Sequence, residues 1–332
     1  MRTLAKVIVW TAVVVLALVA VGWLALRRPD ISYAELEKRH ATPASRYADL
    51  PGGIRVHYQD VGGPGRPTVV LVHGYGDSFL TWERVVQRLS PRFRVIALDL
   101  PGHGLTRAPA NFVAASDNYV PVLEAFAAKA GLQRFTLAGN SLGGGVAWQY
   151  ALAHPERVSG LVLVDAAGWP DETLKSPPLA FRILMSEPGR WWLKHMETRP
   201  ITGPALQMDF HDPKLATPPF VRRWVEVQRA PGHRDILMSL TGGPNSVATA
   251  ERLGRIKAPT LVLHGADDRI IAPASGRKFA QAIPGAKLVI YEKVGHLPQW
   301  EVPDRLAADI AGFMNGRAAP VGAGEGRTQP AA

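Results

Sequence analysis

Short, continuously apolar runs separated by amphipathic stretches set the pattern of the chain after its first 45 residues. Runs of this kind, typical of strands buried on both faces of a parallel sheet, are residues 68–72, 94–98, 135–138 and 160–164. Residues 54–58 alternate between apolar and polar positions, and with a weak strand at 46–50 they predict an antiparallel edge. Helical stretches at 79–89 and 119–130 lie between the strands, so we expect helices on both faces of the sheet.

This alternation stops after residue 168 and resumes near residue 250. Residues 169–249 contain many prolines and helical patches of mixed charge, which predict an inserted helical cap. The later elements are strands at 260–263 and 287–291 and helices at 274–282 and 303–314. The sequence therefore predicts an α/β fold whose core, residues 46–168 and 250–316, contains a mostly parallel eight-stranded sheet.

The N-terminal segment is a candidate membrane helix. Residues 7–26 form a stretch of 20 residues without a charge, and a helix of that length covers about 30 Å, the thickness of a bilayer core. We expect residues 1–28 to anchor the chain in a membrane, the bacterial inner membrane in particular. A cleaved signal segment is the alternative and would give a secreted or periplasmic protein, while a buried soluble helix is the third interpretation.

The segments that flank the core differ from it in composition. Residues 29–45 are polar with a short helical stretch, and they are interpreted as a stalk between membrane and domain. Residues 317–332 are rich in glycine, alanine and proline without periodicity, which is typical of a disordered tail.

Composition removes several function classes. The chain of 332 residues contains no cysteine, which excludes disulfides, thiolate nucleophiles and cysteine metal sites. Its formal net charge of +10 comes from scattered residues rather than from a basic run interleaved with aromatics, so nucleic acid is not an expected partner. Neither a metal nor an organic cofactor is expected, and the oligomeric state stays open.

The motif GNSLG at residues 139–143 directly follows an apolar strand and precedes a helix. Strand, sharp turn and helix form the context of a Gly-x-Ser-x-Gly nucleophile elbow, in which Ser141 is the candidate nucleophile. The small residues Gly139 and Gly143 relieve clashes at the strained turn. The amide of Leu142 begins the helix and is a candidate oxyanion donor.

Two further loops follow predicted strands and carry glycine and histidine. In the motif HGYG at residues 73–76, the Tyr75 amide is the candidate second oxyanion donor, and His73 is assigned a structural role. In the motif DLPGHG at residues 99–104, Asp99 and His103 are interpreted as residues that fix the loop.

The candidate acid and base also follow strands. His296 lies in a glycine-containing loop after residues 287–291 and is the candidate general base. Asp268 follows residues 260–263 and is the preferred acid, although spacing alone leaves its neighbour Asp267 as a rival and Asp165 as a weaker candidate. The order serine, acid, histidine matches that of elbow-bearing hydrolases.

Together these motifs resemble the α/β-hydrolase superfamily over residues 46–316, and most closely its membrane-anchored bacterial esterase and lipase-like members. The resemblance implies a Ser141, Asp268 and His296 triad, oxyanion donors at Tyr75 and Leu142, and hydrolysis of a small-molecule ester or lipid through an acyl-enzyme.

The sequence also fits two other functions, and it offers candidate substrate-binding residues in the cap. Asn140 and the run QWE at residues 299–301 are similar to carbon–carbon bond hydrolases of meta-cleavage products, so that reaction is the first alternative. A non-catalytic, membrane-tethered binding module is the second. In the cap, Trp191, Trp192 and Phe181 are candidate substrate-binding residues, although packing of the cap onto the core explains such aromatics equally well.

Overall fold

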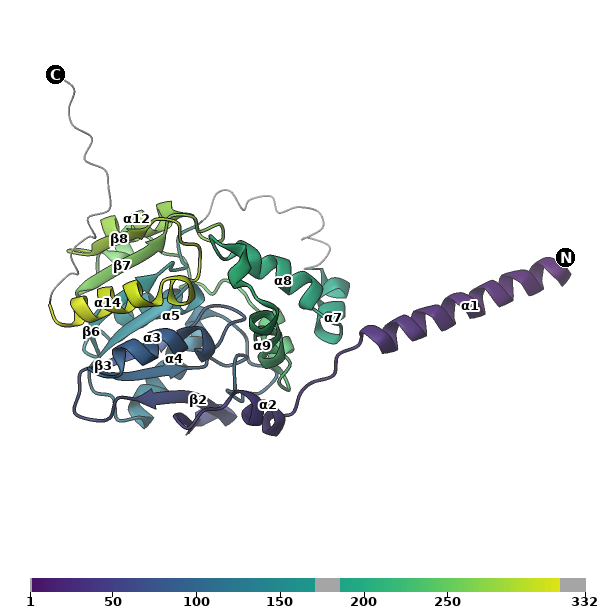
Figure 1. Ribbon diagram of the computed structural model, residues 1–332, viewed down its shortest axis with the longest axis horizontal. Coiled ribbons are helices and arrows are strands. Elements are labelled where there is room, and N and C mark those ends of the chain that lie inside the picture. The colour runs from purple at the N-terminus through teal and green to yellow at the C-terminus, as the bar shows by residue number, and fades with distance from the viewer. Residues whose placement is uncertain (1, 171–185, 317–332) are drawn as a thin grey trace, which may run out of the picture.

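The computed structural model describes residues 2–170 and 186–316, and its centre is one eight-stranded sheet (Figure 1). In spatial order the strands are β1 (Ser45–Leu50), β2 (Ile54–Val61), β4 (Arg94–Leu98), β3 (Thr68–Val72), β5 (Phe135–Asn140), β6 (Val158–Val164), β7 (Thr260–Gly265) and β8 (Lys287–Tyr291). Strand β2 pairs antiparallel with β1 and β4, and all the other pairs are parallel. The predicted sheet, with its antiparallel edge, is confirmed.

Helices cover both faces of this sheet because its inner strands are apolar on both sides. Within β3, Val70 and Val72 join the core on one face, whereas Val69 and Leu71 join the core on the other. The first face packs against α4 (Ser116–Lys129), α5 (Leu142–Ala153), α11 (Ala250–Leu253) and α12 (Pro273–Ala282). The second face packs against α3 (Glu83–Leu89) and α14 (Pro303–Met314). Three short helical elements lie just before longer ones. Pro51–Gly53 precedes β2, Phe79–Trp82 precedes α3, and α13 (Pro298–Glu301) precedes α14.

Further helices lie between β6 and β7, where the sequence predicts a cap. They are α7 (Glu187–His195), α8 (Arg199–Met208), α9 (Pro218–Gln228) and α10 (His233–Met238), with a short turn at Pro213–Leu215. Phe210 and Phe220 from this insert pack with Leu297 from the loop after β8. The insert therefore covers the carboxyl ends of the strands. Residues 169–249 as the exact boundaries of the cap stay a prediction.

The first helix, α1 (Arg2–Leu26), projects away from the body of the molecule (Figure 1). Its segment Val9–Leu26 has a mean hydropathy of 2.5 and is not buried, so within the described residues it is the one helix long and apolar enough to cross a membrane. Either a membrane anchor or a signal segment fits these properties.

The stretch between α1 and β1 is packed against the protein rather than extended away from it. Its helix α2 (Tyr33–His40) buries Leu36 against Leu105 and Ala230. Arg229 and Arg234 of the insert donate hydrogen bonds to the chain around Pro29. Residues 29–45, expected to form a stalk, therefore bring the end of α1 directly onto the insert.

Candidate active site

Ser141 lies at the sharp turn between β5 and α5. Its backbone angles, φ 53° and ψ −118°, fall in a region that residues with side chains rarely adopt. A Cβ atom on Gly139 would lie 2.1 Å from the carbonyl oxygen of Gly143, and one on Gly143 would lie 2.4 Å from that of Val72. The Ser141 N–H donates to the Val164 carbonyl at 3.0 Å, so the sheet holds the strained turn in place. The local geometry is that of the predicted elbow.

The loop after β3 lies against this turn and brings a second free amide near the serine. A Cβ atom on Gly74 would lie 3.2 Å from the Cβ atom of Ser141. Among the described residues, the N–H groups of Tyr75 and Leu142 have no hydrogen-bond acceptor. Two unpaired N–H groups beside a serine are what an oxyanion hole requires.

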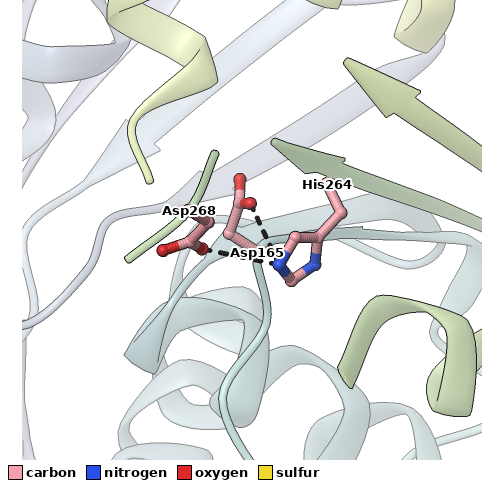
Figure 2. A group of neighbouring side chains, drawn as sticks. All are labelled: Asp165, His264 and Asp268. Atoms are coloured by element: carbon pink, nitrogen blue, oxygen red, sulfur yellow. Dashed lines mark ion pairs between the residues drawn. The ribbon is translucent and has the colours of Figure 1, made fainter. Parts of the chain in front are cut away.

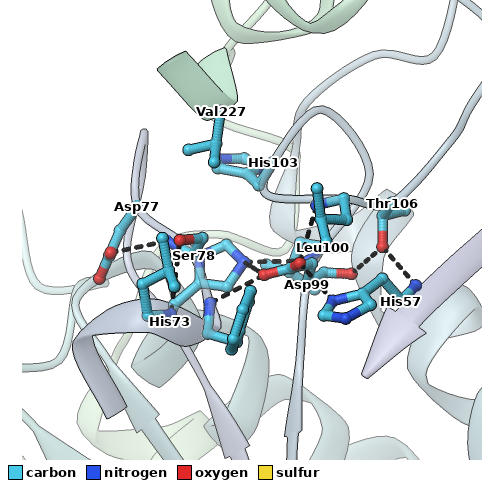
Figure 3. Close-up of polar contacts among 12 residues, drawn as sticks. His57, His73, Asp77, Ser78, Asp99, Leu100, His103, Thr106 and Val227 are labelled. Carbon is cyan, nitrogen blue, oxygen red and sulfur yellow. Dashed lines mark hydrogen bonds and ion pairs between the residues drawn. The ribbon is translucent and has the colours of Figure 1, made fainter. Parts of the chain in front are cut away.

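His73 fixes the loop that carries Tyr75 (Figure 3). The Leu100 N–H donates to its Nε2 at 3.0 Å, so the proton lies on Nδ1, which donates to the Gly74 carbonyl at 2.7 Å. Burial lowers the pKa of His73. The neutral, singly oriented imidazole agrees with the structural role predicted for it.

Asp99 and His103 belong to the same buried network (Figure 3). The Asp99 carboxylate accepts hydrogen bonds from His57 Nδ1 at 2.8 Å, the Phe79 N–H at 2.8 Å and the Leu105 N–H at 2.9 Å. Burial alone would raise the pKa of Asp99, but the hydrogen bond and charge of His57 outweigh burial and lower it. His103 is buried and donates to a carbonyl of its own loop at 3.0 Å. Both residues therefore fix the loops around the candidate site.

Asp268 and His296 form a buried pair from the loops after β7 and β8. The N–H groups of Ile270 and Ile271 donate to Asp268 Oδ1 at 2.8 and 2.9 Å, while His296 Nδ1 donates to Oδ2 at 2.7 Å. Burial would raise the pKa of Asp268, yet hydrogen bonds from His264 and His296 lower it well below its usual value. An ionised carboxylate on Nδ1 leaves His296 Nε2 available to accept a proton.

Ser141 follows β5 and His296 follows β8, and no hydrogen bond joins their side chains, although Asn140 beside the serine donates to the His296 carbonyl at 3.1 Å. The Ser141 hydroxyl makes none with any described residue. Catalytic hydrogen bonds often tighten only in the substrate complex. Proton transfer between these two residues would require that contact to form when substrate binds.

Asp267, the rival acid, points away from this pair. Its carboxylate lies 2.5 Å from Nδ1 of His211 in the insert, and both side chains are about two-fifths exposed, at 42% and 41%. Asp267 therefore connects the loop after β7 to the insert.

Asp165, the weaker candidate, lies beside Asp268, and both face His264 (Figure 2). Its Oδ1 accepts the Gly265 N–H at 2.9 Å, and His264 Nε2 lies 3.5 Å from both Asp165 and Asp268. Burial, together with the negative charge of Asp268, raises the pKa of Asp165 well above its usual value. Burial and the neighbouring carboxylate thus act on Asp165 in the direction opposite to the hydrogen bonds that lower the pKa of Asp268.

This same trio has the residue types of a metal site, with ligand atoms within 4.8 Å of one another. However, His264 Nε2 donates to the Ile271 carbonyl at 2.9 Å, so this nitrogen carries a proton. A protonated nitrogen cannot ligate a metal. The arrangement therefore fits a hydrogen-bonded support for Asp268.

Two residues that the sequence associated with carbon–carbon hydrolases hold the His296 loop. Asn140 Nδ2 donates to the His296 carbonyl at 3.1 Å. Glu301 accepts the Gly295 N–H at 2.8 Å and the His211 N–H of the insert at 3.0 Å. Glu301 thus ties the His296 loop to the insert, a role that no motif in the sequence indicated.

A mainly apolar cavity of about 280 Å³ lies between the insert and the elbow side of the core. Its wall includes Tyr75 at the core and mostly aliphatic and aromatic side chains of α7 to α10, together with Asp209 after α8. Sequence patterns did not single out Asp209, because it belongs to no motif.

Two of the three predicted aromatic substrate-binding residues, Trp191 and Trp192, lie away from this cavity. Neither Trp191 nor Trp192 lines this cavity, and they are 52% and 39% exposed. Trp191 stacks on Trp23 at the end of α1, with ring centroids 5.2 Å apart. Phe181 lies outside the described residues. Trp191 therefore helps to connect α1 to the insert.

Comparison with known proteins gives the family. Residues 67–303 match the family model described as the alpha/beta hydrolase fold. The chain belongs to this family. The match covers the elbow and both loops that carry Asp268 and His296, so the predicted superfamily is confirmed.

Similar members of the alpha/beta hydrolase family differ in their named reactions. A 2-hydroxy-6-oxononadienedioate/2-hydroxy-6-oxononatrienedioate hydrolase of Paraburkholderia phymatum is 30% identical, over 81% of this chain and 95% of that protein. A membrane phospholipase A of known structure, described as a bacterial virulence factor, has a TM-score of 0.70 and 26% identity, over 95% of this chain and 98% of its own. An esterase from a Rhodococcus species has a TM-score of 0.67 and 27% identity, over 84% of this chain and all of its own. These relatives support hydrolase activity for the chain, and their names include both a dienedioate hydrolase and ester hydrolases.

Proposed function

We propose that this hydrolase cleaves carboxylic esters through an acyl-enzyme. Ser141 is the nucleophile, His296 the general base, and Asp268 the carboxylate that orients and stabilises the imidazolium. The amides of Tyr75 and Leu142 are the oxyanion donors. The buried hydrogen bond between Asp268 and His296 supports this assignment of acid and base.

The reaction proceeds in two halves. His296 Nε2 takes the Ser141 proton as the serine oxygen attacks the ester carbonyl, and the two amides hold the resulting oxyanion. His296 then gives its proton to the leaving alcohol, which departs and leaves an acyl-serine. Water attacks the acyl-serine in the same way, with His296 again as base, and releases the acid. No step requires a metal or an organic cofactor.

The observation that carries the choice of ester is the position of the apolar cavity beside the end of α1. Leu193, Lys194 and Met196 line the cavity, and the same segment is bonded to the last residue of α1, because the Glu197 N–H donates to the Leu26 carbonyl at 2.9 Å. An apolar cavity joined to a membrane-spanning helix suits the acyl chain of an ester or lipid. The likeness to a membrane phospholipase A covers 95% of the chain.

Hydrolysis of a carbon–carbon bond is the second candidate, favoured by the reactions for which several similar proteins are named. They include a 2-hydroxy-6-oxo-6-phenylhexa-2,4-dienoate hydrolase of Comamonas testosteroni, 31% identical over 77% of this chain. Both reactions use a serine, a base and an oxyanion hole, so the catalytic residues do not separate them.

A direct comparison of substrates tests the proposal. The full chain in detergent is expected to hydrolyse p-nitrophenyl esters of short to medium acyl length, with a kcat/KM at least about tenfold above that for 2-hydroxy-6-oxo-6-phenylhexa-2,4-dienoate. A preference for the dienoate over every ester would establish the second candidate. A chain that cleaves neither and takes no fluorophosphonate label would instead fit a membrane-tethered binding module.

We also propose that α1 anchors the protein in a bacterial inner membrane, with residues 1–28 as the anchor. The docking of α1 onto the insert through Trp23 and Arg28 supports a helix that is retained rather than cleaved. The chain is expected to stay in the membrane pellet after an alkaline wash and to keep its N-terminal residues in the mature protein. Recovery of a shortened, soluble chain would support the signal segment and a periplasmic or secreted location.

A further inference from the structure

Asp209 is an acidic residue placed where the apolar cavity meets the His296 loop. It follows α8 directly and lines the cavity together with Tyr75. Its backbone carbonyl accepts the His296 N–H at 2.6 Å. A Cβ atom on Gly295 would lie 2.3 Å from that carbonyl, so glycine permits the close approach. The position of Asp209 is therefore fixed relative to His296.

The carboxylate of Asp209 has no compensating partner. Among the described residues no side chain or amide donates a hydrogen bond to it, and no cation forms an ion pair with it. Of the three described cations in the same cavity wall, two pair with other carboxylates, and Arg229 keeps its charge and bonds only a backbone carbonyl. Arg229 bonds the Pro29 carbonyl, Arg234 bonds Asp30, and Lys194 pairs with Asp235. The reactive end of the cavity, where Asp209 adjoins the His296 loop, therefore carries an acid that has no hydrogen-bond or ion-pair partner of its own in the described part of the chain.

Asp209 is half-buried, and the groups around it carry charges of both signs. Burial raises the pKa of Asp209 to about 6, with the charge of His296 acting to lower it and that of Asp268 to raise it. The titratable and charged groups that face Asp209 fall into two sets. Asp77, Asp268 and His296 interact with it electrostatically, and Tyr75, Lys194, Arg229 and Arg234 line the same cavity. Asp209 therefore lies in a cavity wall that is mostly apolar but also carries Lys194, Arg229 and Arg234.

We propose that Asp209 is a specificity-determining residue that keeps anionic groups out of the reactive end of the cavity. An anion placed there would meet a like charge in a poorly solvated space, whereas a neutral acyl chain would not. This inference rests on the proposed function and narrows its substrates to esters whose acyl part is uncharged. The substrates named for the carbon–carbon hydrolases are carboxylates, and an acid at this place disfavours them.

A matched pair of esters tests this selection. p-Nitrophenyl hexanoate and p-nitrophenyl hemiadipate have acyl parts of equal length, and only the second ends in a carboxylate. At about pH 8, Asp209→Asn is expected to raise the ratio of kcat/KM for the anionic over the neutral ester roughly tenfold, because the repulsion between like charges is removed. Asp212→Asn removes the same charge from an exposed residue outside the cavity, and it is expected to leave the ratio unchanged. Equal ratios in wild type and Asp209→Asn would overturn the inference.

Binding provides a second measurement that does not depend on turnover. In a Ser141→Ala background, calorimetry compares hexanesulfonate, which stays ionised throughout, with hexanol. Adding Asp209→Asn is expected to tighten hexanesulfonate binding roughly tenfold relative to hexanol at about pH 8. This result would hold even for a protein that cleaves no ester. Failure of the proposed function and failure of the inference are therefore distinguishable.

The pH dependence of the effect separates a role of the Asp209 charge from a purely structural role. As pH falls from about 8 to about 5, Asp209 passes through its raised pKa and loses its charge, so the advantage of Asp209→Asn is expected to disappear. Histidine can also take up a proton in this range, so the measured quantity is the difference between variant and parent. An advantage of the same size at both pH values would show that charge is not the cause.

Discussion

Replacement of Ser141 by alanine is expected to lower kcat for p-nitrophenyl hexanoate by roughly 10⁵- to 10⁶-fold, the loss typical of removing a serine nucleophile. The variant is expected to fold, because the strained turn depends on the glycines around it and on the backbone bond to Val164 rather than on the hydroxyl. The residual rate would come from the oxyanion amides alone. Steady-state kinetics, with circular dichroism to check folding, measure this effect.

A serine elsewhere on the sheet provides the control. Ser159 lies on β6 with an exposed side chain, at the opposite end of the strands from the elbow. Ser159→Ala is expected to retain activity and to take a fluorophosphonate label, whereas Ser141→Ala is expected to take none. Labelling of Ser141→Ala at the wild-type rate would move the nucleophile to another residue.

The sheet was predictable because its signal is local. In β3 and β5 nearly every position is buried, so an apolar run of the right length identifies the strand. The elbow was predictable for a related reason, since few residue types fit a turn with positive φ between two close backbones. These features need no knowledge of the distant chain.

The insert was harder to predict, because its functional contacts depend on where it folds back onto the core. Asp209 and His211 belong to no motif, yet one lines the cavity and the other holds Asp267. The aromatic residue Trp191 was expected near the substrate but stacks on Trp23 of α1. An aromatic side chain in the sequence indicates burial or stacking without naming the partner. Such pairings appear only with the three-dimensional arrangement.

The choice between Asp267 and Asp268 as the acid also could not be made from the sequence. Spacing leaves Asp267 and Asp268 equivalent, since both follow β7 by a similar distance. The loop turns so that Asp268 faces His296 and accepts two backbone N–H groups, whereas Asp267 faces His211. One residue of difference in the chain thus reverses the direction of the side chain.

Asp268→Ala is expected to reduce kcat roughly 10⁴-fold, since His296 would lose the carboxylate that fixes its tautomer and stabilises its cation. Asp267→Ala is expected to cost less than about tenfold, because that residue is exposed and its partner is in the insert. Asp165→Asn keeps a side chain of the same shape whose oxygen can still accept the Gly265 N–H, so most activity is expected to remain. Kinetics of the three variants measured in parallel distinguish the three roles. Asp268 acts on His296, Asp165 supports the loop, and Asp267 connects the loop to the insert. Equal losses in Asp267→Ala and Asp268→Ala would remove the basis for assigning the acid to Asp268.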